Sequence, residues 1–300
     1  MTQYQDAVLE LQSIRDFLRW GVTSLSQARV FFGHGTDNAW DEAAVLVAHA
    51  LHLQDISPDM LDAKLLAKEK SDIAELFKRR IEERIPAPYL TGMAWFAGLP
   101  FIVDQRAIIP RSPIAELIEG GIQPWLAEVE PAAILDLCAG SGCIGLAAAQ
   151  YFSNASVDLV ELSDEVADLA AKNIEMHALQ DRVTLYRGDL FEPLPVQQYD
   201  IILTNPPYVD AQDYADMPQE FQHEPRLALV AGDDGLSVAH DILANAQKFL
   251  TPQGLLVLEV GNSGIALEEA YPHIPFTWVE LERGGVGVAV IHAADLPSGA

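Results

Sequence analysis

The chain contains 300 residues, of which 50% are hydrophobic and 21% are charged, and its net charge is −26. This composition excludes a disordered chain and is sufficient for one large or two ordinary globular domains. Residues 93–300 hold most of the acid, with eight Lys/Arg against thirty Asp/Glu. Such a domain repels a phosphate backbone and attracts a basic protein, so DNA and naked RNA are poor substrate candidates. Surface acid that only aids solubility remains an alternative for most of these residues.

The two cysteines and the start of the chain indicate a protein of a reducing compartment. Cys138 and Cys143 are too few for a disulfide framework and form no Cys-x-x-Cys pair, so we expect small core residues and no metal site. The start is polar and acidic, unlike a signal peptide, and the longest apolar stretch, residues 43–53, is too short to span a bilayer. We therefore expect a cytoplasmic protein without a membrane partner.

Helical spacing of apolar residues dominates the first part of the chain. It predicts a helix over residues 3–20 that ends at Gly21. Three further helices are predicted over residues 24–32, 40–53 and 71–85. Residues 1–85 are therefore expected to form a small helical domain.

A short linker is expected next, over residues 86–111. Its β-rich sequence predicts a hairpin with Gly98-Leu99-Pro100 as the turn. Ser112 suits the N-cap of a helix over residues 113–120. We expect a second domain over residues 112–300.

Strands and helices alternate from residue 132 onward. The predicted strands are 133–138, 156–161, 183–187, 199–204, 254–260, 276–281 and 286–292, and the predicted helices are 143–152, 164–178, 236–250 and 263–271. This alternation predicts an α/β fold with a doubly wound, mostly parallel, seven-stranded sheet. The last two strands are too close in sequence for a helix between them, so they should pair antiparallel.

A glycine-rich segment follows the first of these strands. Gly140, Gly142 and Gly145 have the G-x-G-x-x-G spacing of a loop that lets a ligand approach bare backbone. Glu161 ends the second strand, where a carboxylate could accept both hydroxyls of a ribose. This pattern alone does not separate a nicotinamide dinucleotide from S-adenosylmethionine.

Two further acids favour S-adenosylmethionine. Asp136 lies just before the glycines, where it could order the loop or meet the amino group of the donor. Asp189 follows the third strand and is placed to accept the exocyclic amine of an adenine, with Leu190 as a wall for the ring. Taken alone, Asp189 could instead be a helix cap or a turn residue, and Glu161 a surface acid.

The segment Asn205-Pro206-Pro207-Tyr208 directly follows the fourth strand. Neither proline can donate to a ladder, so the strand ends in a stiff corner at its carboxyl end, where open α/β sheets bind ligands. The Asn205 amide and the Pro206 carbonyl offer two acceptors for the hydrogens of an NH2 group, and Tyr208 offers a ring to stack on it. The corner therefore predicts a site for a planar group that carries an NH2.

These motifs resemble those of the class I S-adenosylmethionine-dependent methyltransferases, and among them the enzymes that methylate a glutamine amide nitrogen in translation proteins. The resemblance covers nearly the whole chain and includes the segments Tyr89-Leu90-Thr91-Gly92, Ile109-Pro110-Arg111 and Glu224-Pro225-Arg226-Leu227-Ala228-Leu229. Arg111-Ser112-Pro113-Ile114-Ala115-Glu116 and Cys138 look closer to the branch acting on ribosomal large-subunit protein three than to the release-factor branch. Ala139 departs from the Thr that is usual in that branch.

The resemblance implies a Rossmann-like catalytic domain over 112–300 and a substrate-recognition role for residues 1–85. The implied cofactor is S-adenosylmethionine, and the implied substrate is a basic ribosomal protein. The residues implied to bind the cofactor are Asp136, Cys138, Ala139, Gly140, Ser141, Gly142, Glu161, Asp189, Leu190 and Asn205. The residues implied to carry the chemistry are Asn205, Pro206, Pro207 and Tyr208. Asn205 and Pro206 would accept the two amide hydrogens, and Tyr208 would pack on the amide plane.

Methylation of a release-factor glutamine remains an alternative, and three functions outside this family remain open. A methyltransferase acting on adenine or cytosine amino groups would use the same corner, but the acidic second domain disfavours it. A nicotinamide oxidoreductase would use the glycine loop and Glu161 but leaves the corner unexplained. A ribosome assembly factor that only retains the fold would show no turnover.

Overall fold

The computed structural model describes residues 2–126, 130–232 and 234–297, within two compact units. Unit 1 comprises Met1–Met93 and Pro218–His223, and unit 2 comprises Ala94–Met217 and Glu224–Ala300. The three-part division expected from the sequence, with boundaries at 85 and 111, stays a prediction, and its outer ends at residues 1 and 298–300 lie outside the described residues.

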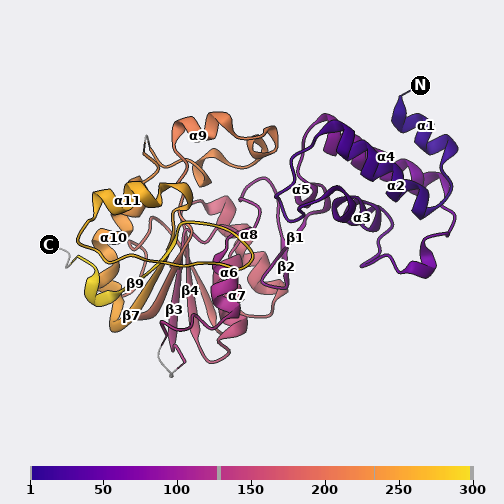
Figure 1. Ribbon diagram of the computed structural model, residues 1–300. Coiled ribbons are helices and arrows are strands. Elements are labelled where there is room, and N and C mark those ends of the chain that lie inside the picture. Colours follow the sequence, from indigo (N-terminus) through magenta and orange to yellow (C-terminus); the bar gives the residue numbers. More distant parts are fainter. Residues whose placement is uncertain (1, 127–129, 233, 298–300) are drawn as a thin grey trace. The chain divides into compact units, whose positions relative to one another are not determined.

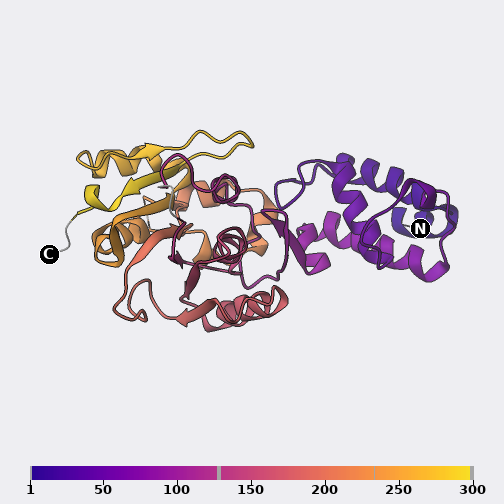
Figure 2. The same cartoon turned by 90° about the horizontal axis from the view of Figure 1, so that it is seen from below.

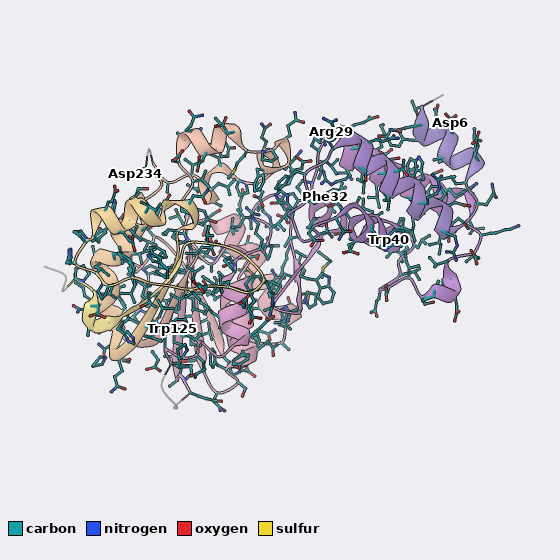
Figure 3. The ribbon with its side chains drawn as sticks, viewed as in Figure 1. Asp6, Arg29, Phe32, Trp40, Trp125 and Asp234 are labelled. Carbon is teal, nitrogen blue, oxygen red and sulfur yellow. The ribbon has the colours of Figure 1, made fainter. Side chains whose placement is uncertain are left out.

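Unit 1 is helical, and its helices pack into a bundle (Figure 2). They are α1 (Gln3–Glu10), α2 (Ile14–Ala28), α3 (Ala39–Ala50), α4 (Ala67–Glu82) and α5 (Ala87–Thr91), with 3₁₀ turns at Pro58–Met60 and Gln219–His223. The bundle core includes Phe17, Leu46 and Phe77, all of them 0% exposed. By contrast, Trp40 on α3 is 54% exposed and lies at the surface (Figure 3).

The single helix predicted over residues 3–20 is wrong, because two helices occupy this stretch. Ser13 begins α2, accepting the Asp16 N–H on its hydroxyl while the Asp16 carboxylate accepts the Ser13 N–H, which is a capping box. Gly21 does not end the helix but lies inside α2. A Cβ atom at Gly21 would overlap the ring of Phe77, so this glycine lets α2 and α4 approach closely.

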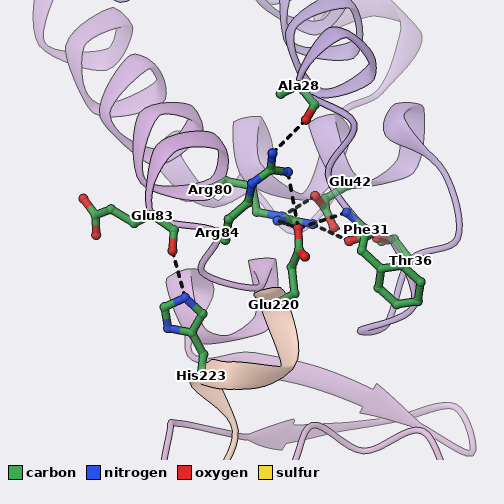
Figure 4. Close-up of polar contacts among 9 residues, drawn as sticks. All are labelled: Ala28, Phe31, Thr36, Glu42, Arg80, Glu83, Arg84, Glu220 and His223. Carbon is green, nitrogen blue, oxygen red and sulfur yellow. Dashed lines mark hydrogen bonds and ion pairs between the residues drawn. The ribbon is translucent and has the colours of Figure 1, made fainter. Parts of the chain in front are cut away.

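The segment Pro218–His223 is anchored in unit 1 by a buried ion cluster (Figure 4). The Arg80 guanidinium donates to Glu42 Oε1 at 2.7 Å and to Glu220 Oε1 at 3.1 Å, and all three side chains are at most 3% exposed. Glu220 Oε1 also accepts the Phe31 N–H at 2.9 Å. A short segment far along the chain thereby completes the helical unit.

A hairpin of β1 (Met93–Phe96) and β2 (Leu99–Ile102) follows α5, as the sequence predicts. Its turn, however, is Ala97-Gly98, with φ values of 47° and 72°, and not Gly98-Leu99-Pro100. Two-residue turns with both φ values positive match the twist of the flanking strands, so the turn is confined to these two residues and Leu99 already begins β2.

Unit 2 contains a seven-stranded sheet with the order β5-β4-β3-β6-β7-β9-β8. Its strands are β3 (Ala133–Leu137), β4 (Ser156–Glu161), β5 (Val183–Arg187), β6 (Tyr199–Thr204), β7 (Leu250–Glu259), β8 (Thr277–Trp278) and β9 (Val288–His292). Strands β3 to β7 are parallel, and β9 runs antiparallel to both β7 and β8. The predicted doubly wound, mostly parallel sheet with a final antiparallel pair is therefore confirmed, although β8 is shorter than expected.

Helices cover both faces of this sheet. They are α6 (Ile114–Glu119), α7 (Cys143–Tyr151), α8 (Asp164–Met176), α9 (Ala211–Asp216), α10 (Ser237–Phe249) and α11 (Gly264–Ala270), with 3₁₀ turns at Arg226–Ala228, Gly261–Ser263 and Ala293–Asp295. Figure 1 shows α6 and α7 on one side of the sheet and α10 and α11 on the other. The chain order reverses between β3 and β6, which places a ligand-binding crevice at their carboxyl ends. Across the described ranges, no helix combines the length and apolar character needed to cross a membrane.

Candidate active site

The three glycines after β3 have two different roles. Gly140 and Gly142 have φ values of +57° and +81°, which a glycine adopts without strain, and a Cβ at Gly140 would meet no atom within 4 Å. Gly142 is the N-cap of α7. A Cβ at Gly145 would overlap Leu159, so this third glycine lets α7 pack closely on the sheet. The loop therefore presents bare backbone at Gly140, while Gly145 serves the packing behind it.

Asp136 lies fully buried at the end of β3. Its Oδ2 accepts the Gly145 N–H at 2.7 Å, and its Oδ1 has no hydrogen-bond partner among the described residues. Burial raises the pKa of this carboxyl to about 8, so the neutral acid dominates at pH 7. Of the two expected roles, the hydrogen bond supports the ordering of the loop, and contact with a donor amino group stays a prediction.

Glu161, the last residue of β4, closes the glycine loop from the side. Its Oε2 accepts the Gly140 N–H and its Oε1 accepts the Ser163 N–H, both at 2.9 Å. Burial raises the pKa of Glu161, and the two N–H groups oppose that rise. Each carboxylate oxygen keeps a further lone pair, so the side chain can still accept two ligand hydroxyls.

Two predicted binding residues have a left-handed backbone without being glycine. Cys138 has a φ of 58° and Leu190 a φ of 42°, a conformation that costs a non-glycine residue on the order of 1–3 kcal/mol. Cys138 and Cys143 are both free thiols. Burial raises the pKa of each, that of Cys143 to about 12, so both stay protonated at neutral pH.

The corner after β6 carries acceptors that no described residue uses. The Asn205 side chain and the Pro206 carbonyl form no hydrogen bond with any residue in the described ranges, and Asn205 is half-buried. Tyr208, in contrast, is held firmly, because its hydroxyl donates to Glu259 at 3.0 Å and its carbonyl accepts the Ser263 hydroxyl at 3.0 Å. The corner thus combines two available acceptors with a fixed ring.

One cavity of about 570 Å³ opens at these strand ends in unit 2. The predicted residues that line it are Cys138, Gly140, Glu161, Asp189, Leu190, Asn205 and Pro207. Those that do not are Asp136, Ala139, Ser141, Gly142, Pro206 and Tyr208. Arg106, Leu227 and Val230 line the cavity without having been predicted. The structure therefore brings Gly140, the acids Glu161 and Asp189, and the corner residues Asn205 and Pro207 to one space.

Two buried carboxylates near the corner, Glu224 and Glu259, had no role assigned from the sequence. Glu224 is 3% exposed, accepts both terminal nitrogens of Arg111 at 2.6 and 2.8 Å, and also accepts the Ile109 N–H at 2.9 Å. This bidentate pair joins the segment before α6 to the segment that follows the corner. Glu259 was missed, although an acid that ends the apolar run of β7 is a signal that could have identified it.

The matching family model and three known proteins similar to this chain are all named as methyltransferases. The model of the methyltransferase small domain matches residues 124–232. The ribosomal protein uL3 glutamine methyltransferase of Francisella tularensis subsp. tularensis is 46% identical over 96% of this chain and 92% of its own length. That of Bordetella pertussis is 47% identical over 90% of this chain and 92% of its own length. A solved methyltransferase from Pyrococcus furiosus is 18% identical, with a TM-score of 0.48, over 73% of this chain and 95% of that chain.

Proposed function

We propose that this chain, which belongs to the family of ribosomal protein uL3 glutamine methyltransferases, transfers a methyl group from S-adenosylmethionine to a glutamine amide nitrogen of uL3 in the cytoplasm. The observation that carries the proposal is the shared cavity, which is lined both by Gly140 and Glu161 and by Asn205 and Pro207. A methyl donor and an amide acceptor must meet in one enclosed space, and this cavity offers it.

The residues of the cavity fit S-adenosylmethionine. Glu161 keeps lone pairs for two ribose hydroxyls, and the open space above Gly140 admits a ligand against the backbone. Asp189 lines the same cavity as an acceptor for an exocyclic amine, with Leu190 beside it. When bound there, the sulfonium supplies an electrophilic methyl group.

The corner would activate the glutamine by orienting it. An amide nitrogen is a poor nucleophile, so catalysis depends on placement and on exclusion of water. Asn205 Oδ1 and the Pro206 carbonyl accept the two amide hydrogens, and the ring of Tyr208 packs on the amide plane. These hydrogens become more acidic as the nitrogen attacks, so both acceptors bind the transition state more tightly than the ground state. The proton leaves after the transfer, and no strong base is required.

The decisive experiment is methyl transfer with labelled donor and purified uL3, read by mass spectrometry for one methyl group on a glutamine. Asn205→Ala should abolish transfer while the donor affinity, measured by calorimetry, stays within a few fold. A release factor and DNA serve as parallel substrates, and methylation of either in place of uL3 would overturn the substrate assignment. Full activity of Asn205→Ala would remove this residue from the mechanism.

A further inference from the structure

A buried acid lies next to the Asn-Pro-Pro-Tyr corner, where it has no direct ion pair in the described ranges and the charge of Arg111 offsets only part of the cost of its burial. Glu259 ends the apolar strand β7 and is 4% exposed. Its hydrogen-bond partners among the described residues are two hydroxyls, those of Ser112 at 2.5 Å and Tyr208 at 3.0 Å. Burying a carboxylate without an ion pair reduces stability, and an apolar side chain of the same volume would avoid that loss. Its presence therefore calls for a role beyond packing.

The hydrogens at this site indicate that Glu259 is an ionised acceptor. The Ser112 oxygen accepts the Ile114 N–H at 3.2 Å, and its own hydrogen has Glu259 as its acceptor. The Tyr208 hydroxyl likewise has no acceptor other than Glu259 in the described part of the chain. With one hydroxyl donor on each carboxylate oxygen, a carboxyl hydrogen would have no acceptor among the described residues, which favours the ionised acid although burial raises the pKa of Glu259.

Tyr208 is confined by three further contacts, one on its ring and two on its backbone carbonyl. A Cβ atom at Gly261 would lie 2.5 Å from Cε2 of the ring, so the ring lies directly on bare backbone there. Ser263 donates to the Tyr208 carbonyl, and a Cβ at Gly235 would overlap that same carbonyl oxygen. The orientation of the ring is therefore set by contacts that the short corner sequence does not contain.

We propose that Glu259, supported by Ser112, is a positioning residue that fixes the ring of Tyr208 and enriches it in electron density for the methyl transfer. This inference rests on the proposed function, in which the ring packs on the substrate amide. A phenol that donates to a carboxylate carries more negative charge on its ring face, and such a face attracts positive charge. The amide becomes positive only as its nitrogen attacks, so the dyad of Tyr208 and Glu259 favours the transition state over the bound substrate.

The first test compares Glu259→Gln with Tyr208→Phe and the double variant, using uL3 and labelled donor. Gln keeps the shape and one acceptor oxygen but removes the charge. We expect kcat to fall about tenfold in Glu259→Gln, with KM for uL3 and the donor affinity within about twofold, because a charge effect on the ring acts in the transition state. The double variant should be no slower than Tyr208→Phe, since both changes break the same dyad. Glu269→Gln, an exposed acid of α11, is the matched control and should equal wild type.

The second test does not require activity. Protein labelled at tyrosine Cζ should give eight resonances, one for each tyrosine. The resonance missing from Tyr208→Phe should shift in Glu259→Gln and stay in place in Glu269→Gln. Thermal unfolding of each variant checks that the fold is retained.

The outcomes separate this inference from the proposed function. An unshifted Tyr208 resonance, unchanged kcat in Glu259→Gln, or additive losses in the double variant would overturn the positioning role. A shifted resonance in a protein that methylates a release factor in place of uL3 would leave the dyad intact and refute the substrate. A loss confined to KM would also overturn the proposal, because it would place the effect in substrate binding.

Discussion

The buried carboxylates Glu42 and Glu220 of unit 1 are held by a cation, whereas three buried carboxylates at the strand ends of unit 2 are held by N–H and O–H groups. Glu224 of unit 2, which pairs with Arg111, follows the pattern of unit 1. In unit 1, Glu42 and Glu220 share the guanidinium of Arg80. Burial alone would raise the pKa of Glu220, but the Phe31 N–H and Arg80 bring it below its usual value. The carboxylates of this cluster therefore have their hydrogen-bond and ion-pair partners inside the unit.

In unit 2, Asp136, Glu161 and Glu259 lie at the ends of strands, Glu161 lines the cavity, and none of the three forms an ion pair with a described residue. Burial raises the pKa of all three. A closed ion cluster stabilises a fold by matching charges, whereas a carboxylate held only by neutral donors keeps capacity for a ligand at the expense of stability. The partner of a buried acid, a cation or a neutral donor, therefore helps to distinguish a structural acid from a candidate functional one.

The largest effect is expected from removal of the shared cation in unit 1. Arg80→Met leaves Glu42 buried without a cation and Glu220 with only the longer ion pair to Arg84 at 3.6 Å, and the free energy of unfolding should fall by about 3–5 kcal/mol. Urea denaturation followed by circular dichroism measures it. Arg79→Met, on the exposed side of the same helix, is the control and should change little. Equal unfolding free energies of Arg80→Met and Arg79→Met would contradict the idea that the buried acids of unit 1 depend on Arg80 as their cation.

Removal of a unit 2 acid should affect binding more than stability. Glu161→Gln replaces the acceptor that we propose for two ribose hydroxyls, and hydrogen bonds to a charged group contribute about 1.5–3 kcal/mol. Calorimetry should therefore show S-adenosylmethionine affinity reduced roughly ten- to a hundredfold. The unfolding free energy without donor should change little, because the variant also removes a buried charge. Glu175→Gln, exposed on α8, provides the control, and undiminished affinity of Glu161→Gln would contradict a binding role.

The pH dependence of stability should distinguish Asp136 from an ordinary acid. Its pKa is raised from 3.8 to about 8 in the folded protein, so the folded state binds more protons than the unfolded state between these values. The contribution of Asp136 to stability is thus full below the lower value and is lost as pH rises toward the upper one. Between pH ~5 and ~7, wild type should lose up to about 1.4 kcal/mol per pH unit relative to Asp136→Asn. Parallel pH curves for the two proteins would show that Asp136 titrates normally.

The smallest effect concerns the strained cysteine. Cys138→Gly relieves a left-handed backbone but gives up a half-buried thiol, so the unfolding free energy should change by less than about 1 kcal/mol. Cys143 lies at the start of α7 with a helical backbone, and Cys143→Gly should destabilise by about 1 kcal/mol. Thermal melts of the pair compare the two positions directly. A larger loss at 138 than at 143 would argue against backbone strain at the loop.

Much of unit 2 could be predicted because its signals are local. The alternation of apolar strands and helices specified the parallel sheet, and parallel strands bring their carboxyl ends to one edge. Gly140, Glu161 and Asn205 each follow or end such a strand, so their meeting at one cavity followed from the sheet. The family resemblance drawn from these motifs is confirmed by relatives at 46% and 47% identity.

The sequence by itself determined the sheet, the glycine loop and the stiff corner, since each depends on residues that are neighbours in the chain. Only the tertiary structure decided that Glu220 completes unit 1 from 140 residues beyond Arg80, and that Glu259 holds Tyr208 from 51 residues away. It also decided that Gly21 lies inside a helix against Phe77 and does not end one. The physical reason is the same in each case. The role of a buried charge or of a glycine depends on the group packed against it, and that group is distant in the sequence, so no local pattern identifies it.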